Sequence, residues 1–162
     1  MKRINIALCG LLGACATVAT VVDPPLAQLD RWNRAPAAEI IAEPVVVPCP
    51  AENPACDRLH LRRAEACVAA AMAMRAPRAA CPGLAARPLL ECAAEGYRAA
   101  PRNPAFVANQ AQALTCLAHL SAPVTRAALA AEALTAARAV PGGRAAEFVA
   151  RAQEAAIVQG ER

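Results

Sequence analysis

Thiol and imidazole groups are the side chains in this sequence that could hold a metal ion. The two histidines each follow a cysteine within about one helical turn, with Cys56 before His60 and Cys116 before His119. Two cysteines and two histidines can bind zinc in a tetrahedral site. Against such a site, the two Cys/His pairs lie far apart, there is no Cys-x-x-Cys pair, and other cysteines would be left over. Cys-x-x-Cys-His is absent too, which argues against an attached haem, so we expect no metal and no cofactor.

The N-terminal residues have the composition of a targeting segment. The basic pair Lys2-Arg3 precedes an apolar run at residues 4–12, which is followed by the small residues Gly13 and Ala14. This order of basic, apolar and small residues is typical of a secretory signal. The run is too short to cross a bilayer as a helix, which needs about 20 apolar residues. We therefore expect the chain to be exported.

Leu12-Gly13-Ala14-Cys15 resembles the lipobox of bacterial lipoproteins. The resemblance implies that the Cys15 thiol receives diacylglycerol, with acyl chains such as palmitate, and that cleavage before it removes residues 1–14. Ala16 at the second mature position implies sorting to the outer membrane, so the anchored protein would face the periplasm. The alternative is an ordinary secretory signal cut between Ala14 and Ala19, which would also export the chain.

Export determines how the cysteines are interpreted. With Cys9 in the signal and Cys15 carrying lipid, six of the eight cysteines remain, and an oxidising compartment favours their pairing into up to three disulfides. Their connectivity stays open, because six cysteines allow 15 pairings. Cys49 and Cys56 flank a short Pro-rich loop that a disulfide could close. The six candidates are Cys49, Cys56, Cys67, Cys81, Cys92 and Cys116.

Motifs for catalysis are scarce. The sequence has no Gly-x-Ser-x-Gly, no phosphate loop and no His-Glu-x-x-His. Glu91 and Glu95 stand one helical turn apart, which could pair two carboxylates but is also typical of a solvated helix face. His60 and His119 fall in predicted Ala/Leu-rich helices, where packed or surface histidines are frequent. We therefore predict that the protein is not an enzyme.

Composition argues against a nucleic-acid partner. Without the signal, the chain has no lysine, fifteen arginines and thirteen acidic residues, and the whole sequence has one tryptophan, one tyrosine and two phenylalanines. Nucleic-acid binding calls for a clustered basic face and usually for aromatic stacking platforms. The abundant alanine favours helices over strands. The counts therefore favour an all-α protein and argue against a nucleic-acid partner.

Prolines punctuate residues 15–53, which follow the predicted cleavage site. Proline disfavours a continuous helix and favours extended chain, so we expect a disordered, lipidated tether that holds the rest of the protein off the bilayer. One interruption, from Leu26 to Asn33 and including Trp32, is expected to form a short turn of helix that packs on the body or on the membrane surface.

From residue 54 onward the pattern is helical. Asn53-Pro54 and Asn103-Pro104 each supply an N-cap residue followed by proline at the first helical position. The predicted helices start at Pro54 and Pro104 and run over residues 88–99, 124–139 and 144–158, with Pro- and Gly-containing turns between them. They predict a small all-α domain of antiparallel helices over residues 54–162.

An internal similarity suggests repeats. Residues 98–108 resemble residues 138–150, and Pro101 and Pro141 are forty residues apart, a spacing typical of stacked helix pairs. Over residues 99–141 the chain resembles the tetratricopeptide repeat (TPR) family. The matching positions are Val107, Gln110, Ala111 and Leu114 in one helix and Leu129, Ala133, Ala136 and Pro141 in the next.

The match to that family has departures. Gln110 is polar, Ala133 is small where an aromatic residue is usual, and fourteen residues separate Leu114 from Leu129, more than the family pattern has. The resemblance implies about two and a half stretched, degenerate hairpins, similar to Sel1-like repeats, in a TPR-like solenoid.

These features predict an envelope lipoprotein whose TPR-like domain binds a protein or peptide. Resemblance to repeat-containing lipoproteins implies a scaffold or assembly factor of the pilus or secretin type. The first helix of a pair would line a binding groove, so we expect contacts from Asn109, Gln110, Gln112 and Ala113. The alternatives are a purely structural envelope protein without a groove ligand and a small accessory protein to a periplasmic enzyme.

Overall fold

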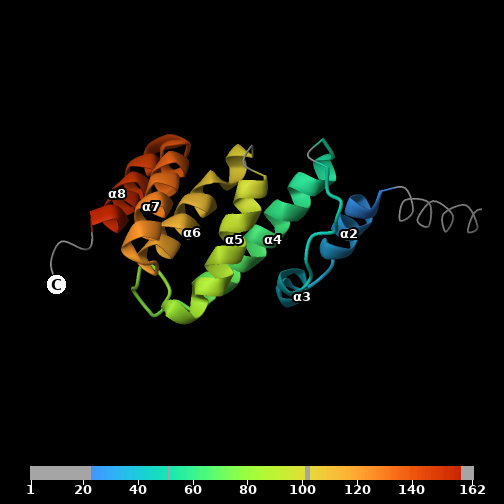
Figure 1. The fold of residues 1–162 in the computed structure, drawn as a ribbon, viewed down its shortest axis with the longest axis horizontal. Coiled ribbons are helices and arrows are strands. Elements are labelled where there is room, and N and C mark those ends of the chain that lie inside the picture. The colour runs from blue at the N-terminus through green and yellow to red at the C-terminus, as the bar shows by residue number, and fades with distance from the viewer. Residues whose placement is uncertain (1–22, 51, 101–102, 158–162) are drawn as a thin grey trace, which may run out of the picture. The chain divides into compact units, whose positions relative to one another are not determined.

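The computed structural model describes residues 23–50, 52–100 and 103–157 (Figure 1). The predicted signal and Cys15 lie outside these residues. Within them the chain forms seven α-helices and no strand, which confirms the predicted all-α class. The helices are α2 (Pro24–Trp32), α3 (Ala37–Ala42), α4 (Pro54–Ala73), α5 (Arg87–Ala99), α6 (Val107–His119), α7 (Pro123–Arg138) and α8 (Ala145–Ile157). Short 3-10 turns at Leu84–Ala86, Pro104–Phe106 and Gly142–Arg144 precede α5, α6 and α8.

The chain forms two compact units, and the boundary between them lies inside α4. The first unit ends at Leu59 and the second begins at His60. Helix α4 starts at the predicted position, because the Asn53 side-chain oxygen accepts the backbone N–H of Ala55 at 2.9 Å. The units are therefore joined through a helix and not through the loop that the sequence predicted as the domain boundary.

The prediction of a disordered tether over residues 15–53 is wrong for its described part, which contains α2 and α3. Asp23 caps α2 by accepting the backbone N–H of Leu26 at 3.0 Å, and two prolines occupy the first helical positions, where an N–H has no partner within the helix. The expected short helix around Trp32 is present, and its Trp32 side chain is fully buried. Prolines start helices here instead of preventing them, and burial of the indole removes a large apolar area from water.

The described residues between α3 and α4 have no regular secondary structure. A disulfide between Cys49 and Cys56, whose Cα atoms are 5.5 Å apart, joins this segment to α4. The expected closure of the Pro-rich loop by these two cysteines is confirmed.

The helices of the second unit begin and end within a few residues of the predicted positions. Asn103 caps its turn as expected, with its side-chain oxygen accepting the N–H of Ala105 at 3.1 Å. Because the following three residues form a 3-10 turn, α6 starts at Val107 and not at Pro104. None of the described helices, the 20-residue α4 included, is long and apolar enough to cross a membrane.

Helices α5, α6, α7 and α8 pack side by side in chain order, and α6 also packs directly on α8 (Figure 1). The α6, α7 and α8 helices share an apolar cluster built largely from small side chains, which let helices approach closely. Its buried members are Val107, Ala111, Ala136, Ala137, Val140 and Phe148. In this cluster α6 therefore contacts α7, the next helix in the chain, and also α8, which does not follow it directly.

Helices α4 and α5 approach each other closely at Gly96. A Cβ atom on Gly96 would lie 2.6 Å from the carbonyl oxygen of His60 and 2.9 Å from the Cβ of Ala64. Both distances are shorter than van der Waals contact. The absence of a side chain at Gly96 is therefore what allows the two backbones to lie this close. A disulfide between Cys67 and Cys92 joins the same two helices.

Candidate functional site

The four residues predicted to contact a partner all lie on α6. Asn109 is exposed, and Gln110 and Gln112 are partly exposed. Ala113 is 0 % exposed, so the prediction was wrong for this residue: its place on the helix turns the methyl group into the core of the second unit. Contact with a partner by the other three stays a prediction.

Polar side chains of α4, α6 and α8 are linked across the second unit. The amide of Asn109 on α6 donates to Glu65 Oε2 on α4 at 2.7 Å. Arg151 on α8 donates from Nη1 to Gln112 Oε1 at 3.3 Å and from Nη2 to Glu147 Oε1 at 2.6 Å. We call these five residues, Glu65, Asn109, Gln112, Glu147 and Arg151, the polar row. All five are at least partly exposed, so alternate helices contribute to this polar surface.

Sequence reasoning missed the members of the polar row on α4 and α8. A signal for them was present, because Asn109 follows Glu65 by 44 residues and Arg151 follows Gln112 by 39, close to the forty-residue internal spacing. Counting about forty residues backward or forward from the contact residues predicted on α6 leads to positions on α4 and α8.

Gln112 also fixes the loop that precedes α5. Its side-chain amide donates to the carbonyl oxygen of Ala80 at 3.3 Å and lies 3.2 Å from Cys116 Sγ. Cys116 in turn forms a disulfide with Cys81 in the same loop. The loop that Gln112 contacts is therefore also joined to α6 by a covalent bond.

Glu65 receives a second hydrogen bond, from the buried hydroxyl of Tyr97 on α5. Burial, and then the neighbouring Glu65 carboxylate that accepts this hydrogen bond, raise the pKa of Tyr97 far above its ordinary value of 10. One carboxylate on α4 thus accepts hydrogen bonds from α5 and from α6, and it connects the polar row to the interior of the unit.

We expect Tyr97 to remain protonated as the pH rises past 10, until the second unit unfolds. Because the folded-state pKa is raised, the unfolded state loses its proton first; the stabilisation is fully present below the unfolded pKa and is lost as the pH rises above it. Tyr97 is the only tyrosine, so the ultraviolet absorbance of phenolate reports this group alone. The phenolate signal should appear together with loss of helical circular dichroism.

A phenolate signal near pH 10 in a protein that keeps its helical spectrum would contradict this expectation. The matched variant is Tyr97→Phe, which keeps the ring but removes the hydroxyl. It should cost about 1 kcal/mol through the lost hydrogen bond to Glu65, and it should remove the contribution of this group to alkaline unfolding.

All six candidate cysteines are paired, in the disulfides Cys49–Cys56, Cys67–Cys92 and Cys81–Cys116. The three predicted disulfides are therefore confirmed, and their pairing is now known. The zinc site that was considered would need the thiolates of Cys56 and Cys116, which these bonds consume. Over residues 23–50, 52–100 and 103–157, no group of three or more His, Cys, Asp or Glu side chains is placed to hold a metal ion.

The neighbouring carboxylates of α5 lie on a solvated face. Glu91 and Glu95 are both exposed, and Glu91 accepts a hydrogen bond from Arg87 Nε at 2.8 Å, one helical turn earlier. An exposed ion pair of this type is common on helices and explains Glu91 without a catalytic role.

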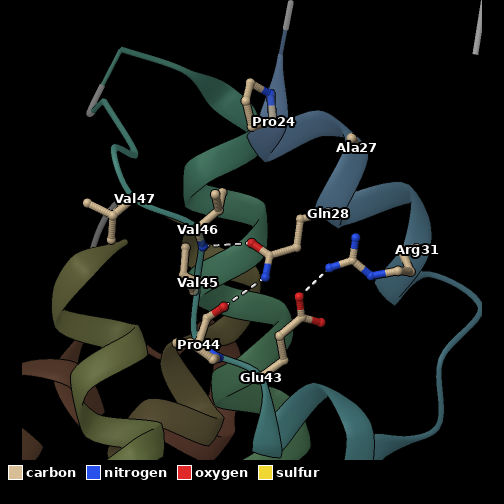
Figure 2. Close-up of a pocket in the computed structure, with 9 residues that line it drawn as sticks. All are labelled: Pro24, Ala27, Gln28, Arg31, Glu43, Pro44, Val45, Val46 and Val47. Carbon is tan, nitrogen blue, oxygen red and sulfur yellow. Dashed lines mark hydrogen bonds and ion pairs between the residues drawn. The ribbon is translucent and has the colours of Figure 1, made fainter. Parts of the chain in front are cut away.

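The first unit has a pocket between α2 and the segment that follows α3 (Figure 2). Gln28 lies at its centre: its Nε2 donates to the carbonyl oxygen of Pro44 at 2.8 Å, and its Oε1 accepts the N–H of Val46 at 2.8 Å. This amide therefore holds the backbone on both sides of Val45, and the remaining lining is largely aliphatic. The volume is about 520 Å³, and the lining residues are Pro24, Ala27, Gln28, Arg31, Glu43, Pro44, Val45, Val46 and Val47.

Glu43 closes the end of this pocket near the last turn of α2. Its carboxylate accepts a hydrogen bond from the indole N–H of Trp32 at 2.7 Å and pairs with Arg31, which faces it in Figure 2. The Trp32 hydrogen bond is the largest cause that lowers the pKa of Glu43 below its ordinary value of 4.5. Burial opposes it, and the charge of Arg31 adds to the lowering. The folded first unit therefore favours the ionised form of the Glu43 carboxylate.

Acid should weaken the first unit through Glu43. Because its pKa is lowered in the folded state, its contribution to stability is present above pH 4.5 and is lost as the pH falls through the folded-state pKa. Glu43→Gln should be less stable than the native protein at pH 7, and the difference should shrink in acid. Urea unfolding followed by the fluorescence of Trp32, the only tryptophan, measures it. A stability difference that is the same at pH 7 and pH 3 would contradict the assignment.

Comparisons with protein-family models, with curated proteins and with solved structures found no match to this chain. The functional conclusions below therefore depend on the residues and geometry described above.

Proposed function

We propose that the protein is an exported lipoprotein whose acylated Cys15 anchors it at the periplasmic face of the outer membrane and whose second unit binds a protein or peptide. It acts as a scaffold or assembly factor of the cell envelope, of the kind that assists pili or secretins. Its second unit is a degenerate TPR-like repeat domain, and the polar row is the surface that contacts the partner.

The three disulfides support export. Disulfides persist in oxidising compartments such as the periplasm and are rare in proteins of the cytosol. All three bridges have at least one cysteine that is almost fully buried, namely Cys56, Cys67 and Cys116. They therefore belong to the packed interior, as expected of structural bridges.

The packing of α6 supports the repeat assignment. In stacked helix pairs, the first helix of one pair packs on its own second helix and on the first helix of the next pair, and α6 packs on both α7 and α8. The valine, leucine and alanine positions matched to the TPR pattern are buried, whereas Gln110, which departs from the pattern, is partly exposed and Pro141, which follows α7, is exposed. The buried positions are Val107, Ala111, Leu114, Leu129, Ala133 and Ala136.

The observation that carries the proposal is the polar row on alternate helices. In a stack of helix pairs, equivalent helices form one extended surface, which suits an extended partner chain. Amide and charged side chains such as Asn109, Gln112 and Arg151 can exchange their present hydrogen bonds for bonds to a peptide backbone. Three predicted contact residues lie on the central helix of this surface.

The test measures whether exchanging the two charged residues of one ion pair in the polar row, Glu147 and Arg151, changes the yield of a crosslinked partner. A photocrosslinking residue at Gln110 is introduced into the membrane-bound protein, and the partner is identified by mass spectrometry. Glu147→Arg combined with Arg151→Glu preserves an ion pair at i,i+4 spacing but reverses the charges beside Gln112. The matched control exchanges Arg87 and Glu91, an exposed i,i+4 pair on α5 outside the polar row.

We expect the exchange on α8 to lower the yield of one crosslinked partner about tenfold, as expected for loss of about 1.4 kcal/mol of binding energy, and the exchange on α5 to leave it unchanged. Helical circular dichroism of both variants should match that of the native protein. The absence of any crosslinked partner would favour the purely structural envelope protein, and equal partner yields from both exchanges would overturn the assignment of the polar row as the contact surface.

A further inference from the structure

We infer that the first unit lies against the lipid bilayer. It contacts the membrane surface through three exposed aliphatic residues near the start of α2, namely Pro24, Leu26 and Val47, which we call the apolar edge. This inference rests on the proposed acylation of Cys15. It assigns to the first unit a partner, the surface of the anchoring bilayer, that the anchor by itself does not require.

The first argument is the length of chain between the lipid and the folded unit. Asp23, which caps α2, is the eighth residue after Cys15. Eight residues span at most about 26–29 Å when fully extended. A tether that reached Asn53 would span several times that distance. The folded first unit must therefore begin close to the bilayer, instead of being held away from it by a long linker.

The second argument is the apolar character of the first unit near the start of α2, which is the end of this helix closest in sequence to the lipidated Cys15. Val47 is 87 % exposed and Leu26 is 40 % exposed. Val47 and Pro24 line the same end of the pocket, whereas Arg31 and Glu43 face each other at its other end (Figure 2). Transfer of exposed aliphatic side chains from water into the interface of a bilayer lowers the free energy. The end of α2 nearest to the lipid is thus the end suited to contact it.

The third argument concerns charge. Residues 23–59 contain six acidic residues and three arginines, so anionic lipids do not attract this unit. Residues 16–22 carry no charge. Contact with the bilayer therefore depends on the apolar edge and on its short separation in sequence from Cys15, and it should not weaken as the salt concentration rises, unlike adsorption by opposite charge.

The experiment uses the full mature protein in vesicles of phosphatidylethanolamine and phosphatidylglycerol. The photoreactive residue p-benzoylphenylalanine replaces Val47 or Leu26, and lipid crosslinks are counted by mass spectrometry. The control position is Asn33, which is exposed at the opposite end of α2, about 10 Å further along the helix. Trp32 fluorescence verifies that each variant has a folded first unit, and the mass of the N-terminal peptide establishes whether Cys15 is acylated.

We expect lipid crosslinks from positions 47 and 26 to exceed those from position 33 about tenfold, with no decrease at high salt. Equal yields at the three positions in an acylated protein would overturn the inference and leave the proposed anchor intact. Yields that fall with salt would overturn its apolar basis. A mature protein without acyl chains on Cys15 would overturn the anchor, and the inference with it.

Discussion

Gly96→Ala is expected to lower the free energy of unfolding of the second unit by about 1–3 kcal/mol, the usual cost of overpacking. At an ordinary helix position the same change is stabilising by roughly 0.5–1 kcal/mol, because glycine is a poor helix former. Here the new methyl group would lie 2.6 Å from the His60 carbonyl oxygen, and backbone cannot move aside as a flexible side chain can. Helices α4 and α5 would have to separate.

The measurement is thermal unfolding followed by circular dichroism, and the matched control is Gly83→Ala. Gly83 has φ −77° and a Cβ built there meets no atom within 4 Å, so alanine should be neutral or stabilising by about 0.4–1 kcal/mol. If Gly96→Ala raised the unfolding temperature, helix propensity would outweigh packing, and the close approach of α4 and α5 would be wrong.

Removal of the Cys67–Cys92 disulfide is expected to cost the second unit about 3.5 kcal/mol. The bridge closes a loop with a sequence separation of 25 residues, and restriction of the unfolded chain by a loop of that size supplies about this free energy. For a unit of this length the loss corresponds to a fall of about 14–28 °C in the unfolding temperature. Cys67→Ala combined with Cys92→Ala, analysed by calorimetry, measures the effect.

The matched control is Cys49→Ala combined with Cys56→Ala. Its separation of seven residues predicts a smaller cost of about 2.3 kcal/mol, and the cost should fall on the first unit, whose unfolding Trp32 fluorescence reports. An unchanged transition of the second unit after removal of Cys67–Cys92 would show that packing alone holds α4 and α5 together.

The sequence predicted the helices of the second unit well, because their limits depend on local signals. Asn53-Pro54 and Asn103-Pro104 specify a cap and a first turn regardless of what packs on them later. The prediction of a disordered tether was wrong because the structure of this segment depends on contacts between residues that are distant in the sequence. Its fold depends on burial of Trp32 and on the clamp that Gln28 makes to a segment sixteen residues away, and neither can be inferred from a count of prolines.

The candidate surface was predicted in part for a similar reason. Assignment to the first helix of a helix pair predicted Asn109 and Gln112 as surface residues, but that assignment alone did not separate them from Ala113, which faces the core. The partners Glu65 and Arg151 come from helices about forty residues away in each direction. Only the stacking of alternate helices brings them beside α6, and that stacking is a property of the folded unit.

The order of the cysteines along the chain affects how the protein matures. The first two pair with each other, but the other bridges interlace, since Cys67 joins Cys92 across Cys81, and Cys81 joins Cys116 across Cys92. In the export that we propose, a chain translocated with its N-terminus first presents Cys67 and Cys81 to an oxidant before Cys92 arrives, and pairing of these neighbours would be non-native. Thiol–disulfide exchange would then have to correct it. Maturation of the second unit should therefore depend on a disulfide isomerase, whereas the bridge of the first unit can form directly as the chain emerges.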